Sequence, residues 1–100
     1  MEMKRLRLKS PADADYLEAL RWYEERQPGL GQEFDAELLA LFERIKQNPE
    51  LFQKETSLVR KARMPRFKYR IYFRVEGDEI GVLAIWHPSR NPETLRQRLQ

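Results

Sequence analysis

Hydrophobic and polar residues alternate along the second half of the chain in the manner of β-strands. From Phe67 to Val75, the odd-numbered positions are apolar, whereas the even-numbered positions are Lys68, Arg70, Tyr72 and Arg74. This two-residue period predicts a strand with one apolar face and one cationic face. Gly77-Asp78 predicts a tight turn, and a second strand follows it as far as Trp86. The expected register pairs Val75 with Ile80, Phe73 with Val82, Ile71 with Ala84, Tyr69 with Trp86, Tyr72 with Leu83, Arg70 with Ile85 and Lys68 with His87.

The first half of the chain has the longer period of amphipathic helices. We expect a first helix capped by Ser10 and ending at Gln27, with Tyr16, Ala19, Leu20 and Tyr23 on its buried side. After Pro28-Gly29-Leu30-Gly31, the spacing of Phe34, Leu38, Leu41, Phe42 and Ile45 predicts a second helix that ends at Asn48-Pro49. A link this short predicts that the two helices pair antiparallel and that their apolar stripes cover a sheet.

Shorter patterns complete the expected order of elements. Lys4 to Lys9 alternates like a strand, residues 50–57 are expected to form a loop, and Leu58 to Met64 a further strand. Pro92 to Leu99 predicts a final helix with Asn91 as its cap. The prediction is therefore an α+β fold, β-α-α-β-β-β(-α), in which a helical hairpin packs on one face of a small, mostly antiparallel sheet. One hundred residues are expected to make a single domain, residues 1–100.

Charge is distributed unevenly along the chain. Residues 10–55 contain 11 acidic and 5 basic residues, whereas residues 56–100 contain 4 acidic and 10 basic residues. The cations are interleaved with aromatic residues, which favours an acidic or polyanionic partner over an ordinary solvated surface. The chain has no cysteine, which excludes disulfides and thiolate zinc sites. No segment has the pattern of a signal peptide or a membrane span, so we expect a cytoplasmic protein that does not bind membranes.

Several segments together resemble the RelE/ParE superfamily of bacterial type II toxins, and the ParE-like, or plasmid-stabilisation, branch most of all. They are Ala19-Leu-Arg-Trp-Tyr-Glu24, Pro28-Gly-Leu-Gly31 with Phe34, Ile45-Lys-Gln-Asn-Pro-Glu50, Val59-Arg-Lys-Ala62, the run from Arg66 to Val75 and the run from Val82 to Pro92. No one segment is diagnostic, but their order over nearly the whole chain is specific for the superfamily.

The resemblance implies a toxin that the acidic and apolar C-terminal segment of a cognate antitoxin neutralises. Operator DNA would be bound only through that antitoxin. ParE-type relatives inhibit DNA gyrase, whereas RelE-type relatives cleave mRNA on the ribosome, and the fold alone does not choose between these targets. A third alternative is an inactive module that binds only the antitoxin.

Candidate catalytic residues are few. Metal-free RNA cleavage needs a base, an acid and cations that stabilise the phosphorane. Arg70 and His87, the only histidine, match positions that carry catalysis in some ribonucleases of the superfamily, but only Glu50 and Glu55 are candidates for an acidic base. A histidine before proline at a strand end is also typical of a structural role. We therefore interpret the chain as a non-catalytic toxin that inhibits DNA gyrase in the manner of its ParE-type relatives, without cofactor or metal.

The residues expected to bind the antitoxin or the target are mainly those of the cationic segment. They are Arg60, Lys61, Arg63, Arg66, Lys68, Arg70 and, near the end of the chain, Arg90. Tyr23, on the helix stripe, and Trp86, on the apolar face of the sheet that the helices cover, are interpreted as core residues. Trp22 lies off the helical stripe and is a candidate for contact with a partner.

Overall fold

The computed structural model describes residues 4–100, and it confirms the α+β fold and the predicted order of elements. Along the chain lie β1 (Arg5–Leu8), α1 (Ser10–Arg26), α2 (Leu30–Gln47), the short 3-10 helix η1 (Pro49–Leu51), β2 (Gln53–Lys54), β3 (Arg60–Arg63), β4 (Arg70–Glu76), β5 (Glu79–Trp86) and α3 (Pro92–Arg98). The segment predicted as a loop, residues 50–57, therefore contains most of η1 and all of β2.

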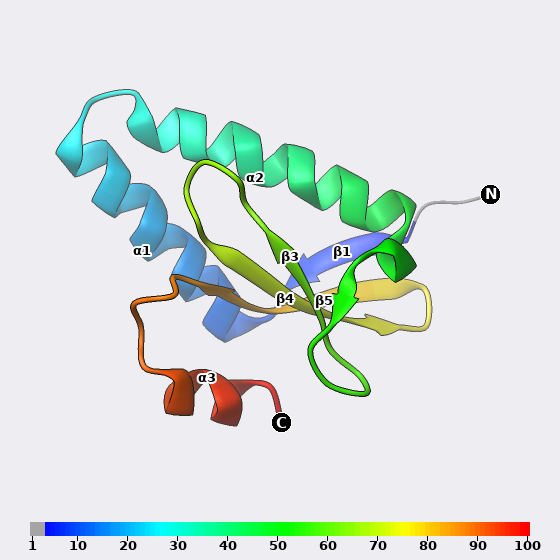
Figure 1. Ribbon diagram of the computed structural model, residues 1–100. Helices are drawn as coiled ribbons and strands as arrows, with labels where there is room; N and C mark the ends of the chain where they lie inside the picture. The colour runs from blue at the N-terminus through cyan, green and yellow to red at the C-terminus, as the bar shows by residue number, and fades with distance from the viewer. Residues whose placement is uncertain (1–3) are drawn as a thin grey trace.

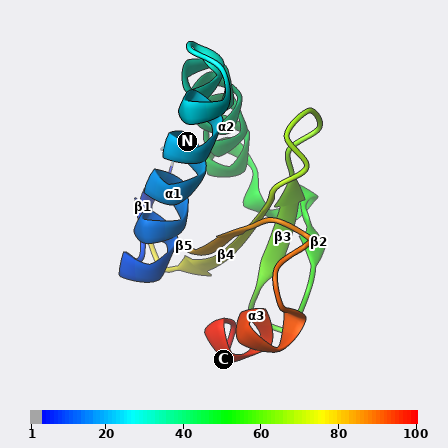
Figure 2. The same ribbon diagram turned by 90° about the vertical axis from the view of Figure 1, so that its left-hand side faces the viewer.

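The described strands form one sheet of five in the order β1-β5-β4-β3-β2. β1 runs parallel to β5, and the other neighbours are antiparallel. α1 and α2 lie antiparallel over the sheet, as expected (Figure 1). Viewed from the side, this hairpin lies on one side of the sheet, and α3 lies apart from it at the C-terminal end (Figure 2).

The connection between α1 and α2 depends on glycine. Gly29 has a φ of 91°, which costs a glycine little. The Glu24 carboxylate accepts the backbone N–H groups of Gly29 and Gly31, each at 3.0 Å, so it satisfies two donors at the start of α2. A Cβ at position 31 would lie 2.9 Å from that carboxylate and 3.1 Å from the Leu20 carbonyl oxygen, so the close approach of the helices excludes a larger residue. At the start of α1, the predicted cap is wrong: Lys9 occupies the cap position and makes no side-chain cap, and Ser10 is already helical.

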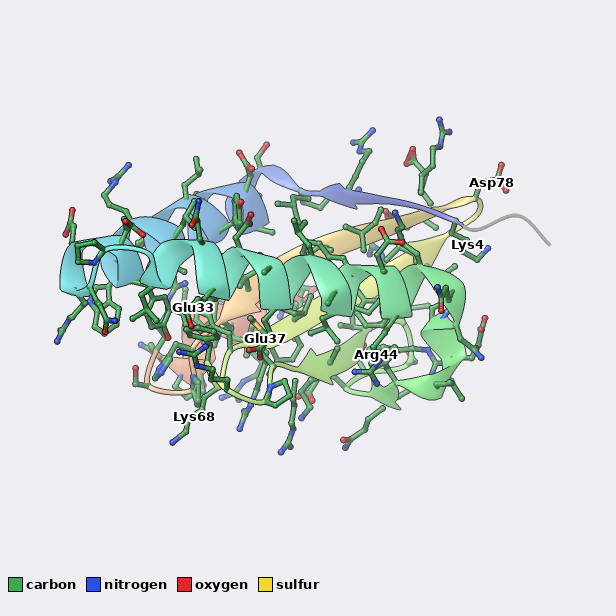
Figure 3. All side chains as sticks on the ribbon, turned by 90° about the horizontal axis from the view of Figure 1, so that it is seen from above. Lys4, Glu33, Glu37, Arg44, Lys68 and Asp78 are labelled. Atoms are coloured by element: carbon green, nitrogen blue, oxygen red, sulfur yellow. The ribbon has the colours of Figure 1, made fainter. Side chains whose placement is uncertain are left out.

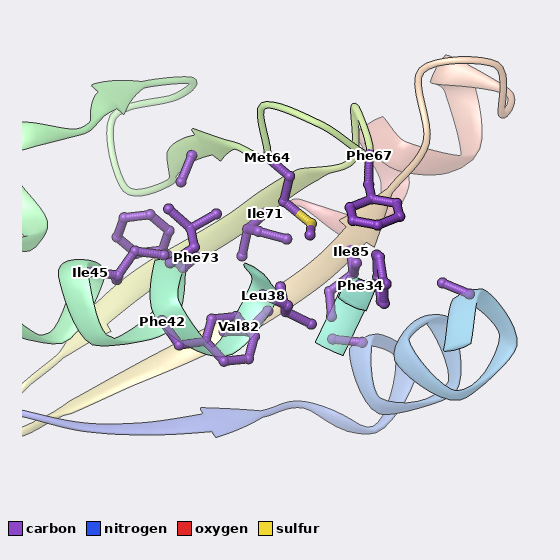
Figure 4. Packing of buried hydrophobic residues seen from close by; sticks show 14 of the residues in the cluster. Phe34, Leu38, Phe42, Ile45, Met64, Phe67, Ile71, Phe73, Val82 and Ile85 are labelled. Carbon is purple, nitrogen blue, oxygen red and sulfur yellow. The ribbon is translucent and has the colours of Figure 1, made fainter. Parts of the chain in front are cut away.

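The main core lies between the helical hairpin and the sheet. Phe34, Leu38, Phe42 and Ile45 of α2 are buried against residues of β4 and β5 (Figure 4). The facing sheet residues are Ile71, Phe73, Val82 and Ile85. The predicted stripe of α2 and the burial of Ile71 and Phe73 on β4 are thereby confirmed, whereas Val75, near the end of that strand, is 37% exposed.

The opposite face of the sheet is not uniformly cationic, contrary to the prediction. Tyr72, Leu83, Ala84 and Trp86 are buried there in a second cluster with Val59. Leu95 and Leu99, in and just after α3, pack against this cluster. Trp86 is a core residue as expected, but it belongs to this second cluster and not to the helix-covered face. The cations on this face therefore surround an apolar cluster covered by α3.

A β-bulge divides the β4–β5 register into pairs that match the prediction and pairs that do not. Val75 pairs with Ile80 and Phe73 with Val82, as predicted. The ladder then shifts at Tyr72/Phe73, and Leu83 is left out of the pairing. The remaining pairs are Tyr72 with Ala84, Ile71 with Ile85 and Arg70 with Trp86, so the predicted partners of these residues are wrong. A bulge is consistent with this shift because one strand contributes an extra residue.

The connection between β3 and β4 is longer than predicted. β4 begins at Arg70, so Phe67, Lys68 and Tyr69 do not extend the strand, and the predicted pairs of Tyr69 with Trp86 and Lys68 with His87 do not form. Lys68 has a φ of 64°, the left-handed region that non-glycine residues rarely adopt. Arg66 holds this loop to α2 through the Glu33 carboxylate at 2.6 Å and, with its backbone N–H, through Glu37 at 3.1 Å. In Figure 3, Glu33 and Glu37 project from α2 toward the loop, and the Lys68 side chain extends away from the helix.

Candidate functional site

The seven cations predicted to bind a partner fall into two groups. Four already interact within the fold. Arg60 donates to the Phe52 carbonyl at 2.8 Å, Lys61 pairs with Glu55 at 3.1 Å, Arg66 with Glu33 at 2.6 Å and Arg90 with Asp15 at 3.0 Å. These contacts give the four side chains a structural role in addition to any part in binding.

Arg63, Lys68 and Arg70 form no ion pair with a carboxylate anywhere in residues 4–100. Arg63 is directly opposite Arg70 in the β3–β4 register, and Arg70 is opposite Trp86. Like charges at facing positions destabilise a sheet, so this pair adds no stability of its own. Lys68 is held in a strained backbone conformation beside them in sequence. These three cations are the part of the predicted surface that forms no ion pair within residues 4–100.

His87 stabilises the turn that follows β5. Its Nδ1 accepts the backbone N–H of Ser89 at 3.1 Å and lies 2.7 Å from the Ser89 hydroxyl. The backbone N–H of Arg90 donates a hydrogen bond to the His87 carbonyl at 3.0 Å and closes the same turn. The ring also packs edge-on against Tyr69, with 5.2 Å between centroids. Because Nδ1 accepts a backbone hydrogen bond, the remaining ring nitrogen carries the proton of the neutral side chain.

The acidic residues considered as bases lie elsewhere. Glu55 is paired with Lys61, and Glu50 lines a separate cavity with Leu58 and Val75 at the end of the sheet near the β4–β5 turn. Neither glutamate is among the residues that surround His87. The structure thus brings Tyr69, His87 and Arg90 together, and it does not add the predicted acidic partner.

Sequence reasoning missed a buried carboxylate, Asp15 of α1. Asp15 is 5% exposed and accepts the Ile85 backbone N–H at 3.0 Å. It also accepts from Arg90 at 3.0 Å and from Arg98 at 2.8 Å. A signal was present, because Asp15 falls between Ala12 and Ala19 on the helical face that is buried, where an unpaired acid would be costly. This carboxylate joins α1, β5 and α3.

The same two arginines frame Trp86. The Arg90 guanidinium lies 3.7 Å from the Trp86 ring centroid and the Arg98 guanidinium 5.2 Å. The arginines therefore satisfy Asp15 and also cover the indole by cation–π contact. Within the part of the chain that the structure describes, the indole N–H of Trp86 is buried without a hydrogen-bond partner.

A cavity of about 290 Å³ opens between α1 and the turn after β5. It is lined by Asp15, Glu18, Ala19, Trp22, Tyr23, Tyr69, Ile85, His87, Ser89 and Arg90. Burial is the main reason that the pKa of Tyr69 is raised to about 12, and the nearby Tyr23 and Glu18 raise it further. Burial also raises the pKa of Tyr23. Both phenols therefore remain protonated near neutral pH and can donate hydrogen bonds.

Among residues 4–100 there is no group of three or more histidine, cysteine, aspartate or glutamate side chains placed to hold a metal ion. No helix in the same range has the length and apolar character needed to cross a membrane.

Comparisons with known proteins agree with the fold. A solved chain from the chromosomal ParDE TA system from P. aeruginosa is 22% identical, with a TM-score of 0.74 over 85% of this chain and 96% of that chain. A search of curated proteins finds no match. The family model for the ParE toxin of the type II toxin–antitoxin system parDE matches residues 6–92. The chain therefore belongs to the ParE toxin family of type II toxin–antitoxin systems.

Proposed function

We propose that this toxin inhibits DNA gyrase by binding it, without catalysing a reaction, and that an acidic segment of a cognate antitoxin neutralises it. Membership of the ParE family supports the role of toxin and implies an antitoxin. The choice of a binding mechanism rests on one observation, the use of His87 in the turn after β5.

The chemistry around His87 is poorly suited to RNA cleavage. A ribonuclease needs one group that removes the proton of the 2′-hydroxyl and another that protonates the leaving oxygen. Nδ1 of His87 is engaged by the backbone, and Tyr69, with a pKa of about 12, is too weak an acid to act as a phenolate base near pH 7. Glu50 and Glu55 are not among the residues around this site. The acid–base pair predicted from the sequence is therefore not assembled around the histidine.

The surface is better suited to binding. Arg63, Lys68 and Arg70 carry charge that the described part of the fold does not neutralise, next to an apolar cluster under α3. Cations beside apolar side chains favour a partner segment that is acidic and partly apolar. An antitoxin segment of that composition would neutralise the three charges and cover the surface.

The experiment compares the two targets with the same protein. The purified chain is added to gyrase and relaxed plasmid DNA, and supercoiling is followed; in parallel it is added to ribosomes carrying mRNA. We expect inhibition of supercoiling with no mRNA cleavage. Because a binding surface spreads its energy over several contacts, His87→Ala is expected to inhibit gyrase within about threefold of the natural chain.

The contrary result is equally specific. Cleavage of mRNA on the ribosome, lowered by about 10²-fold or more in His87→Ala or Arg70→Ala, would assign an endoribonuclease. Leu39→Ala is the matched control, because Leu39 is 53% exposed on α2 and is not part of the site. If the chain shows neither activity but still binds an antitoxin, the alternative of an inactive antitoxin-binding module replaces the proposal.

A further inference from the structure

The cavity between α1 and the β5–α3 connection is walled by aromatic rings from three parts of the chain. Trp22 and Tyr23 of α1 meet edge to face at 5.0 Å between centroids. Tyr23 lies 6.2 Å from Tyr69, and Tyr69 lies 5.2 Å from His87. Aromatic rings prefer these edge-to-face arrangements, so a further ring can be added to the series with favourable geometry.

The size of the cavity limits what it can hold. Its volume of about 290 Å³ is at the lower end of the roughly 300–1,000 Å³ that is usual for small-molecule sites. Ala19 and Ile85 form apolar parts of its lining, and the other lining residues contribute aromatic rings or polar groups. This space suits a single large side chain better than a whole cofactor.

Trp22 is exposed at the mouth of this cavity. Its side chain is 47% exposed, although a tryptophan on a helix is normally placed to bury its ring. The Arg26 guanidinium lies 4.0 Å from the ring centroid and restrains the indole by cation–π contact. An aromatic side chain that is already ordered loses little entropy on binding, which is the property of an interface anchor.

Arg90 is the lining cation that can meet a carboxylate beside the anchor. Arg90 lines the cavity, and together with Arg98 it more than balances the single charge of Asp15. Tyr69, another lining residue, is flanked in sequence by Lys68 and Arg70, which form no ion pair within residues 4–100. Glu18 of α1 is the other lining carboxylate, and it forms no ion pair within residues 4–100.

We infer that this cavity is the anchor site of an acidic antitoxin segment and that it receives one aromatic side chain flanked by carboxylates. The inference rests on the proposed neutralisation by such a segment, and it adds the position and chemistry of the anchor. The aromatic ring packs between Trp22 and Tyr69, and the flanking carboxylates face Arg90 and the cations beside Tyr69. Burial of the apolar ring slows dissociation of the complex, and the charges orient the bound segment.

The test uses a synthetic peptide and the full chain. The probe is an acetylated and amidated pentapeptide, Asp-Glu-Phe-Glu-Asp, added up to 5 mM to the ¹⁵N-labelled protein. The chain has two tryptophans, so its NMR spectrum contains two indole N–H signals. We expect the Trp22 indole signal and the backbone signals of Ser89 and Arg90 to shift with peptide concentration, and the Trp86 indole signal to stay in place.

Three matched comparisons make the result specific. A peptide with alanine in place of phenylalanine is expected to bind at least tenfold more weakly, and so is Lys-Lys-Phe-Lys-Lys. Trp22→Ala should weaken the phenylalanine peptide at least tenfold, whereas Leu39→Ala, which removes an apolar side chain of similar exposure on α2, should change it less than twofold. Because Trp22 is exposed, we expect Trp22→Ala to fold. A folding defect would be detected as a loss of dispersed signals in its spectrum.

Several outcomes would overturn the inference. They are no shift at 5 mM peptide, shifts that lie away from the cavity, equal binding of the alanine peptide, tighter binding of the cationic peptide, or equal binding by a folded Trp22→Ala. Neither gyrase nor a cell enters this titration. The anchor site can therefore fail while gyrase inhibition stands, and gyrase inhibition can fail while the peptide still binds.

Discussion

Asp15 shows how one residue can connect distant parts of this fold. Its carboxylate accepts from the backbone of β5 at Ile85 and from the side chains of Arg90 and Arg98. The Ile85 N–H lies beyond the end of the β1–β5 ladder, which stops at Leu8 and Val82, so the carboxylate takes the place of a missing strand. A buried charge of this kind is tolerated because each of its partners is close and hydrogen-bonded.

Replacing Asp15 with alanine should be strongly destabilising. The change leaves two arginines and one buried N–H without their acceptor, and breaking such a group typically costs about 3–5 kcal/mol of unfolding free energy. Urea unfolding of Asp15→Ala measures this loss. Glu25→Ala is the control, because Glu25 is an exposed acid on the same helix and its loss should cost less than about 0.5 kcal/mol. Equal stability of the two variants would show that the ion pairs contribute nothing measurable.

The tyrosines give the fold a specific response to alkaline pH. A hydrogen bond to Asp35 raises the pKa of Tyr16 to about 12, and burial raises the pKa of Tyr69 to about 12. Since both folded-state values lie above the ordinary value of about 10, the stabilising contribution is fully present below pH 10 and is lost as the pH rises toward 12. Absorbance at 295 nm should therefore show ionisations later than pH 10 in the folded chain, and Tyr69→Phe should remove one of them. Ionisation of all four tyrosines near pH 10 in the folded chain would contradict these assignments.

At the level of single residues, the sequence predicted which side chains are buried better than it predicted their hydrogen-bond and ion-pair partners. Phe73 and Ile71 are completely buried, as their alternation indicates, and Asn91 caps α3 by accepting the Glu93 N–H at 2.8 Å. Asp15 was missed because a periodic pattern assigns a residue to a face without saying which donors approach from other elements. Arg90 and Arg98 both donate to Asp15, so the sequence did not predict their roles for the same reason.

At the level of elements, the two long helices and the β4–β5 turn could be predicted, but part of the strand register could not. α2 and the Gly77-Asp78 turn have strong local signals, and both occur as predicted. β5 is different, because Ile80 to Trp86 is buried on both faces and contains no polar residue that would mark one face. Alternation therefore does not show which residues of β5 face the helices. The bulge at Leu83 then shifts the later pairs, and no pattern in the sequence marks it. The burial on both faces follows from α3, whose contact with the sheet is not encoded in β5 itself.

Removing α3 should uncover the second apolar cluster without unfolding the domain. Deletion of residues 92–100 removes Leu95, Leu99 and the Arg98 bonds to Asp15 and to the Leu83 carbonyl. Half-burial of two leucines and these hydrogen bonds together correspond to about 2–3 kcal/mol of unfolding free energy. The main core does not include α3, so cooperative unfolding should persist at a lower urea concentration.

Fluorescence gives this deletion a local readout. In a Trp22→Phe background Trp86 is the only tryptophan, and it is 2% exposed in the complete chain. Its emission should shift to longer wavelength after the deletion, because the indole meets water. The full-length Trp22→Phe chain is the reference. An unchanged emission maximum would mean that β5 and its neighbours bury Trp86 without help from α3.

At the level of the whole molecule, the fold brings an acidic half and a basic half of the sequence together. Arg66 of the β3–β4 loop pairs with Glu33 of α2, and Arg90 and Arg98 pair with Asp15 of α1. These contacts use part of the positive charge of the second half. The cations that remain unpaired within residues 4–100 include Arg63 and Arg70, which face each other across β3 and β4. A partner that neutralises them also removes their mutual repulsion, so part of its binding energy comes from relief of a cost already present in the fold.

The association of the toxin with its cognate antitoxin should therefore depend on where the charge lies and not only on how much there is. Arg63→Glu/Arg70→Glu should lower the association rate constant at least about tenfold at low salt and reduce its dependence on ionic strength, because steering by these cations is lost. Arg5→Glu/Arg7→Glu changes the net charge equally, but it places the change on β1, at the opposite edge of the sheet. Stopped-flow measurements from 20 mM to 500 mM salt compare the two variants with the natural chain. If both double variants slow association to the same extent, the toxin is attracted by its overall charge alone; a loss confined to the β3–β4 variant locates the encounter at Arg63 and Arg70.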